Sequence, residues 1–69
     1  MDIYERNLER LKKAAKLLTL ADTSGTLVDR NIVDPLATSK GLVQASRTCL
    51  EFAIRNQEAY VLKRANTRL

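Results

Sequence analysis

The stretch LVQASRTCLEFAIRNQEAYV, residues 42–61, decides the fold of this chain. Its spacing predicts a helix, and on a wheel of about 100° per residue its apolar side chains cover an arc of about 200°. These side chains are Leu42, Val43, Ala45, Cys49, Leu50, Phe52, Ala53, Ile54, Tyr60 and Val61. A helix that packs on one neighbour usually carries an apolar stripe of little more than about 100°. The excess indicates a second contact, most simply with another protein molecule.

The segment before it predicts another long helix, over about residues 2–23. Its apolar residues recur at steps of four, three, four and three, which is the spacing of a helical seam. These residues are Tyr4, Leu8, Leu11, Ala15 and Leu18. Asp2 and Glu5 resemble a capping box at the start, and Gly25 can take the left-handed conformation that closes a helix.

The connection, about residues 24–39, is apolar for a solvated loop. We expect Leu27, Val28, Ile32, Val33 and Leu36 to lie across the end of the helix pair. Asp34-Pro35 has the pattern of an N-cap followed by proline at the first helical position. The connection is therefore either an ordered loop or a short third helix. The last helix starts at Pro35 or near Ser39, with a break or bend at Gly41 because glycine weakens a helix by about 1 kcal/mol relative to alanine.

Two long helices joined by about 15 residues predict one all-α domain over residues 1–69, an antiparallel hairpin with helices at about 2–23 and 40–65. The first helix should cover part of the wide arc, and a second copy should cover the rest to give a four-helix dimer. The residues expected in that oligomer interface are Leu42, Val43, Cys49, Leu50, Phe52, Ala53 and Tyr60.

The size of the chain also favours association. A domain of 69 residues is marginal unless disulfides, a metal or oligomerisation stabilise it. One cysteine and no histidine exclude an intrachain disulfide and a Cys/His zinc site. The acidic start gives no signal peptide, and no apolar run approaches the roughly 20 residues that span a bilayer. We expect a soluble cytoplasmic homo-oligomer that does not bind a membrane.

Catalysis is the class that the composition disfavours most. Histidine, the commonest general base, is missing, and the only glycines, Gly25 and Gly41, cannot build a phosphate-binding loop. Cys49 lies on the apolar arc and is expected in the core or the interface, because free cysteine is usually buried. Asp22, Asp29 and Asp34 match no calcium loop. We therefore expect no enzymatic activity, cofactor, metal or small-molecule substrate.

The net charge of +4 leaves nucleic acid or an acidic partner open. An antiparallel hairpin brings the start of the first helix beside the end of the second, where basic residues could bind phosphate. Acidic residues at that end dilute the charge, so a plain solvated surface is favoured over a binding patch. The candidate contact residues are Arg6, Arg10, Lys13, Lys40, Arg47, Lys63, Arg64 and Arg68.

A partial helix-turn-helix around residues 36–50 is a further hypothesis. Gly41 would lie in its turn, and Ser39, Lys40, Gln44 and Arg47 would read bases. Arg47 fits poorly, because the motif would bury its charge at a cost of several kcal/mol if unpaired.

Polar residues on the last helix carry two further expectations. Arg47, Glu51, Arg55 and Glu58 recur along one side and are expected to form a solvated charge ladder. Asn56 and Gln57 interrupt the apolar arc. Either both lie at the edges of the arc in contact with water, or one of them is a buried amide that fixes the register between subunits.

The favoured function is a non-enzymatic interaction or regulatory module that oligomerises and acts by binding another macromolecule. The alternatives are a small DNA-binding transcriptional regulator and a subunit of a filament or secretion structure. Nothing in the chain names the partner.

Overall fold

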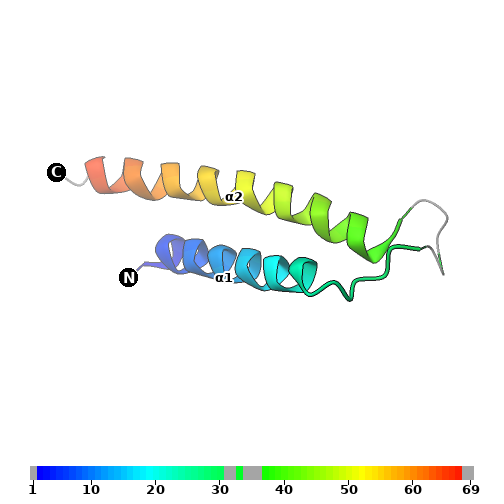
Figure 1. Ribbon diagram of the computed structural model, residues 1–69. Coiled ribbons are helices and arrows are strands. Elements are labelled where there is room, and N and C mark those ends of the chain that lie inside the picture. The colour runs from blue at the N-terminus through cyan, green and yellow to red at the C-terminus, as the bar shows by residue number, and fades with distance from the viewer. Residues whose placement is uncertain (1, 31–32, 34–36, 68–69) are drawn as a thin grey trace.

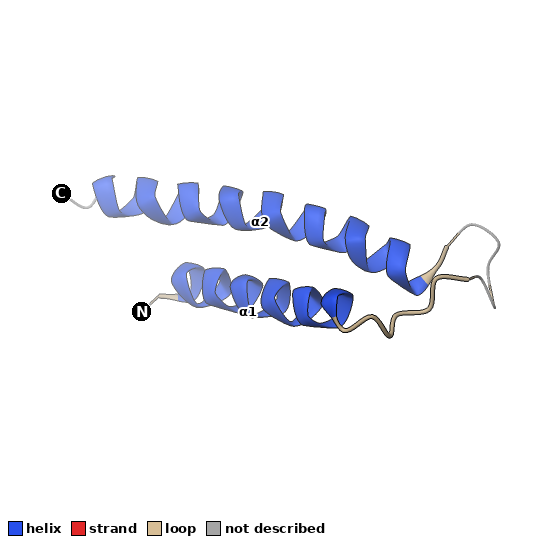
Figure 2. Ribbon diagram, in the orientation of Figure 1, coloured by secondary structure: helices blue, strands red, loops and turns tan. Residues whose placement is uncertain are grey.

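The computed structural model describes residues 2–30, 33 and 37–67, and these form an antiparallel hairpin of two helices (Figure 1). Helix α1 spans Ile3–Thr23 and helix α2 spans Ser39–Thr67, and no strand occurs in this part of the chain (Figure 2). The predicted all-α hairpin is confirmed. The hairpin is a rod of 53 × 21 × 15 Å whose radius of gyration, 15.8 Å, exceeds the about 11 Å of a compact domain of this length.

Helix α1 begins and ends as its sequence predicts. Asp2 is the N-cap, and its Oδ1 accepts a hydrogen bond of 2.9 Å from the backbone N–H of Glu5. At the other end, the backbone N–H of Ser24 donates to the carbonyls of Leu20 and Ala21. Gly25 then takes a φ of 74°, the left-handed conformation that closes the helix.

Helix α2 begins at Ser39, the later of the two predicted starts. Thr38 caps it, because its Oγ1 accepts a hydrogen bond of 3.0 Å from the N–H of Gly41. Gly41 lies in the first turn of a helix that continues to Thr67, so no break follows it. The N–H of Lys40 donates to the carbonyl of Val28 at 3.1 Å and ties the connection to the helix. The predicted Asp34-Pro35 cap lies outside the described residues.

The two helices face each other along matching seams. On α1 the half-buried residues include Leu8, Leu11, Ala15, Leu18 and Asp22, at steps of three, four, three and four. On α2 the half-buried residues include a set with the same alternation of four and three, namely Val43, Arg47, Leu50, Ile54, Gln57, Val61 and Arg64. This alternation is the spacing of a coiled-coil seam.

The described residues of the connection cover the helix pair only in part. Leu27 is half-buried, whereas Val28 is 41% exposed and Val33 96% exposed. The prediction is therefore wrong for Val33, because its side chain lies almost wholly in solvent. Ile32 and Leu36 lie outside the described residues.

The hairpin buries little of its apolar surface. No described residue is fully buried, and the accessible surface is 5610 Å². A compact chain of this mass exposes about 4,400 Å². The hairpin therefore exposes about 1,200 Å² more than a compact monomer would, because each helix contacts only one neighbour.

The Asp2 cap gives the first testable prediction. Asp2→Ala should lower the free energy of unfolding by about 1–2 kcal/mol, because it removes the N-cap and the ion pair with Arg64 described below. Asp2→Asn keeps a capping oxygen and should cost less than half as much. Urea unfolding followed by helical circular dichroism measures both, with the exposed Asp29→Ala as the control. Equal losses for Asp2→Ala and Asp2→Asn would contradict the capping role.

Candidate interaction surface

Helix α2 has two sides with different roles. The inner side carries Val43, Arg47, Leu50, Ile54, Gln57, Val61 and Arg64 and faces α1. The outer stripe consists of Leu42, Ala45, Cys49, Phe52, Asn56 and Ala59, all exposed and spaced by three, four, three, four and three residues. On a helical wheel the centres of the two sets lie about 150° apart. The wide apolar arc therefore splits into a side that forms the hairpin and a side that stays open.

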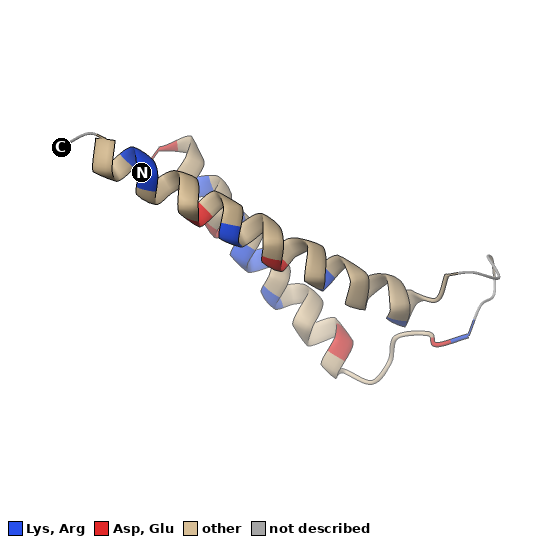
Figure 3. Cartoon of the chain, turned by 90° about the horizontal axis from the view of Figure 1, so that it is seen from above, with Lys and Arg blue, Asp and Glu red and all other residues tan. Residues whose placement is uncertain are grey.

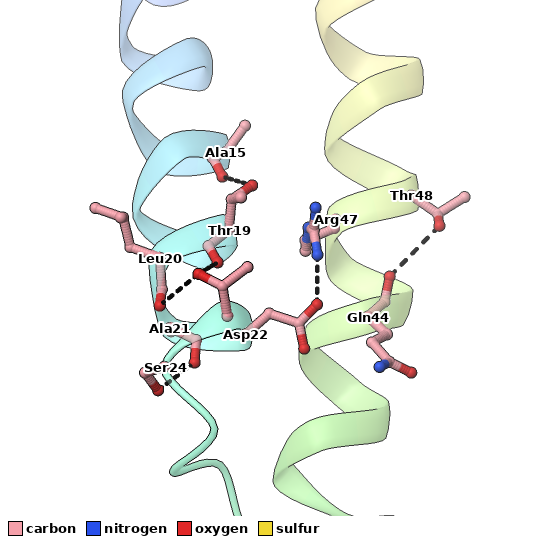
Figure 4. Close-up of polar contacts among 10 residues, drawn as sticks. Ala15, Thr19, Leu20, Ala21, Asp22, Ser24, Gln44, Arg47 and Thr48 are labelled. Carbon is pink, nitrogen blue, oxygen red and sulfur yellow. Dashed lines mark hydrogen bonds and ion pairs between the residues drawn. The ribbon is translucent and has the colours of Figure 1, made fainter.

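An ion pair crosses the inner side near the connection. The guanidinium of Arg47 on α2 points to the carboxylate of Asp22 in the last turn of α1 and donates a hydrogen bond to it (Figure 4). Their side chains are 33% and 13% exposed, so the pair is largely shielded from water. The prediction that Arg47 belongs to a solvated ladder is wrong, because Arg47 falls on the seam at a four-residue step from Val43 and meets a carboxylate there.

A second polar cluster joins the open end of the hairpin. The guanidinium carbon of Arg64 lies 4.2 Å from the centre of the Tyr4 ring, and its Nη1 lies 3.2 Å from Oδ2 of Asp2. The rings of Tyr4 and Tyr60 lie 4.9 Å apart at 46°. Gln57 donates from Nε2 to the carbonyl oxygen of Tyr4 at 3.0 Å. Gln57 thus bonds to α1 of its own chain near the open end, which leaves Asn56 as the amide on the outer stripe.

The outer stripe is exposed along its whole length. Phe52 is 64% exposed and Leu42 57%, and the thiol of Cys49 is free and exposed between them. The guanidinium carbon of Arg55 lies over the Phe52 ring, 5.8 Å from its centre. Cys49 is therefore not part of a core within one chain. Of the two predicted positions for Cys49, the core is excluded, and a position in an interface between chains stays a prediction.

The predicted oligomer interface divides between the two sides. Val43 and Leu50 are half-buried on the inner side, so they belong to the contact with α1. Ala53 is half-buried at the border, and the ring of Tyr60 contacts that of Tyr4 at a tilt while 45% of Tyr60 stays exposed. The sequence alone could not separate the two sets, because both lie on one continuous apolar arc. The burial of each side chain against α1 locates the border, near Ala53.

The basic residues do not gather into one patch. Two of the predicted contact residues are engaged within the hairpin, Arg47 by Asp22 and Arg64 by Asp2 and Tyr4. Arg10 donates to the side-chain oxygen of Asn7 at 2.9 Å. The others in the described part of the chain are exposed, and they are Arg6, Lys13, Lys40 and Lys63. Figure 3 shows lysine and arginine spread along both helices with acidic residues between them. Arg68 lies outside the described residues.

The described residues around 36–50 do not have the geometry of a helix-turn-helix. Gly41 lies inside α2 and not in a turn between two helices, and residues 37–38 precede the helix without being helical. The side chain that fitted the motif least, Arg47, is the one that packs against α1.

No group of three or more potential metal ligands occurs among residues 2–30, 33 and 37–67. Within the same residues, neither helix has a stretch that is long and apolar enough to cross a bilayer. A shallow apolar groove at the open end is lined by Leu8, Glu58, Ala59, Val61, Leu62 and Ala65, and Ala59 joins it to the outer stripe.

Comparisons of the chain with protein-family models, with characterised proteins and with solved structures find no match. The function is therefore argued from the residues alone.

The Asp22–Arg47 pair gives the second prediction. Asp22→Ala should lower the free energy of unfolding by about 1–2 kcal/mol, because it leaves the partly shielded guanidinium of Arg47 without its partner. Replacing both residues with leucine should restore most of this loss, since it removes the unpaired charge and adds apolar contact. Urea unfolding of Asp22→Leu, Arg47→Leu and the variant with both changes measures the coupling.

The matched control is the exposed pair Glu51 and Arg55, four residues apart on α2. Its coupling should not exceed about 0.5 kcal/mol. An equally small coupling between Asp22 and Arg47 would contradict the structural role given to this pair.

Proposed function

We propose that this chain is a non-enzymatic helical interaction module. It self-associates through the outer stripe of α2 and uses the surface that remains exposed to bind another macromolecule. The single observation that supports this most directly is the exposed area of the hairpin, which exceeds that of a compact monomer by about 1,200 Å².

The size of this excess fits a protein interface. A standard interface removes about 800 Å² from each partner. The hairpin can supply this area from surface that a compact monomer of its mass would not expose. Part of this exposed surface is apolar, since α2 leaves Leu42 and Phe52 more than half exposed, and exposed apolar patches often mark binding sites.

The regular spacing of residues in the outer stripe supports the same function. Randomly scattered exposed apolar residues need no explanation, but this stripe keeps the alternating spacing of a coiled-coil seam over 18 residues, from Leu42 to Ala59. The hairpin seam uses the other side of the same helix. One helix therefore carries two seams, and only one of them is filled within the chain.

Sedimentation velocity on the wild type and on Phe52→Glu tests the proposal. The wild type should associate in a concentration-dependent way, and Phe52→Glu should weaken association by at least about a hundredfold, because a charge replaces a large apolar side chain at the centre of the stripe. The native Cys49 provides a second readout. Its reaction with a thiol reagent should slow as the wild type associates and should stay fast in Phe52→Glu.

The matched control is Leu20→Glu, which replaces an equally exposed apolar residue, 57% exposed, on α1 and off the stripe. It should associate like the wild type. A wild type that stays monomeric at all concentrations would refute self-association. An open-ended series of larger species in electron micrographs would favour a filament subunit over a closed oligomer.

A DNA-binding regulator is the second candidate, and one observation favours it. Arg6, Arg10 and Lys13 recur at steps of four and three and are exposed along α1, away from the α2 seam. Three cations in one row can follow a phosphate backbone. Glu9 lies between them and reduces the field, which is why this candidate stands second.

Titration with duplex DNA at low and high salt distinguishes the two candidates. The DNA-binding alternative expects tight binding at low salt that weakens steeply with added salt and is lost in Arg6→Glu/Lys13→Glu. The interaction module expects no such binding. Arg47→Glu is unsuitable as a probe, because it would place two carboxylates together at Asp22 and destabilise the hairpin.

A further inference from the structure

The outer stripe of α2 has the pattern of a seam that is complementary to itself. We propose that its occupant is the outer stripe of a second copy that runs in the opposite direction, with Cys49 facing the partner's Phe52. This inference rests on the proposed function, and it adds the direction and the register of the contact.

The register follows from the size of the side chains in each layer. In the antiparallel register that places Cys49 opposite Phe52, Leu42 falls opposite Ala59 and Ala45 falls opposite Asn56. Each layer then joins a small side chain to a larger one. Layers of similar width allow two helices to stay at one distance along the whole contact, which close packing requires.

A parallel pairing in register gives uneven layers. Phe52 would meet Phe52, while Ala45 would meet Ala45 and Ala59 would meet Ala59. The wide layer would hold the helices apart and leave voids at the two alanine layers, and each void costs stability. An Asn56 pair is compatible with a parallel contact. It does not compensate for the voids on either side of it.

The charges at the margins favour the antiparallel direction as well. The next seam position after Ala59 is Lys63, which a parallel pairing would place against a second Lys63. In the antiparallel register the flanking Arg55 faces Thr48, so no like charges oppose each other. Opposed helix dipoles add a further favourable term.

The shape of the hairpin agrees with this direction. The chain passes from α1 to α2 at the end of the hairpin where α2 begins (Figure 1). Antiparallel copies place their two connections at opposite ends of the dimer. Parallel copies would bring both connections to the same end, where Lys40 of each would add like charge.

Site-directed cross-linking tests the direction and the register. In a Cys49→Ala background, three variants are compared, namely Ala45→Cys, Asn56→Cys and both together. The double variant should give a cross-linked dimer with a short thiol-specific reagent, because the two positions face each other across the interface. Each single variant should give essentially none, since its two thiols lie about 16 Å apart along the dimer axis. The same distance prevents a link within one chain.

The outcomes separate this inference from the proposed function. Sedimentation and circular dichroism first establish that each variant is helical and associates. Variants that associate while a single variant cross-links as well as the double would overturn the antiparallel direction. Association without any cross-link would overturn the register. In both cases self-association through α2 would still stand. A Cys49→Ala protein and a wild type that are both monomeric would overturn this inference and the proposed function together.

Discussion

A hairpin of two helices can bury only one side of each helix. Each helix of this chain has one neighbour, so the seam between α1 and α2 is the whole of the interior, and no described residue is fully buried there. The other features follow from this constraint. Among the described residues the packed interface is that between α1 and α2, and the rod shape, the large exposed area and the exposed aromatic ring of Phe52 all follow from it.

Polar residues within that seam determine how the two helices align. Arg47 pairs with Asp22 at one end, and Arg64 and Gln57 bind Asp2 and Tyr4 at the other. A seam made of leucine and alanine alone would tolerate a shift of one heptad, because every layer would look alike. Such a shift would separate both polar contacts. The two contacts therefore favour the observed register over shifted ones. Partly shielded ion pairs add only modest net stability, so we infer that their main contribution is to the choice of register.

The sequence predicts the helices well and their contacts less well. The ends of α1 follow from Asp2, Gly25 and the seam that starts at Tyr4, since caps and periodicity are local properties. The half-buried position of Arg47 does not follow from such local properties, because a charged residue is normally taken to mark the solvated side of a helix. The spacing from Val43 through Arg47 to Leu50 and Ile54 could have revealed it. The charge of Arg47 indicates the solvated side, whereas its spacing indicates the seam. The structure places it on the seam, where Asp22 of the facing helix pairs with its charge.

The same ambiguity affected the candidate interface. Val43 and Phe52 lie on one apolar arc, and only the position of α1 distinguishes the side that folds the chain from the side that remains open. Under the proposed function, this separation would let the outer stripe of α2 change without loss of the hairpin. A substitution at Phe52 can alter association while Arg47, Gln57 and the rest of the inner side hold the hairpin together. The outward residues of α1, including Arg6 and Lys13, are exposed, and under the same proposal they would be available to specify the macromolecular partner. Folding, association and recognition would then fall on three different helix faces, which is how a chain of 69 residues could carry all three.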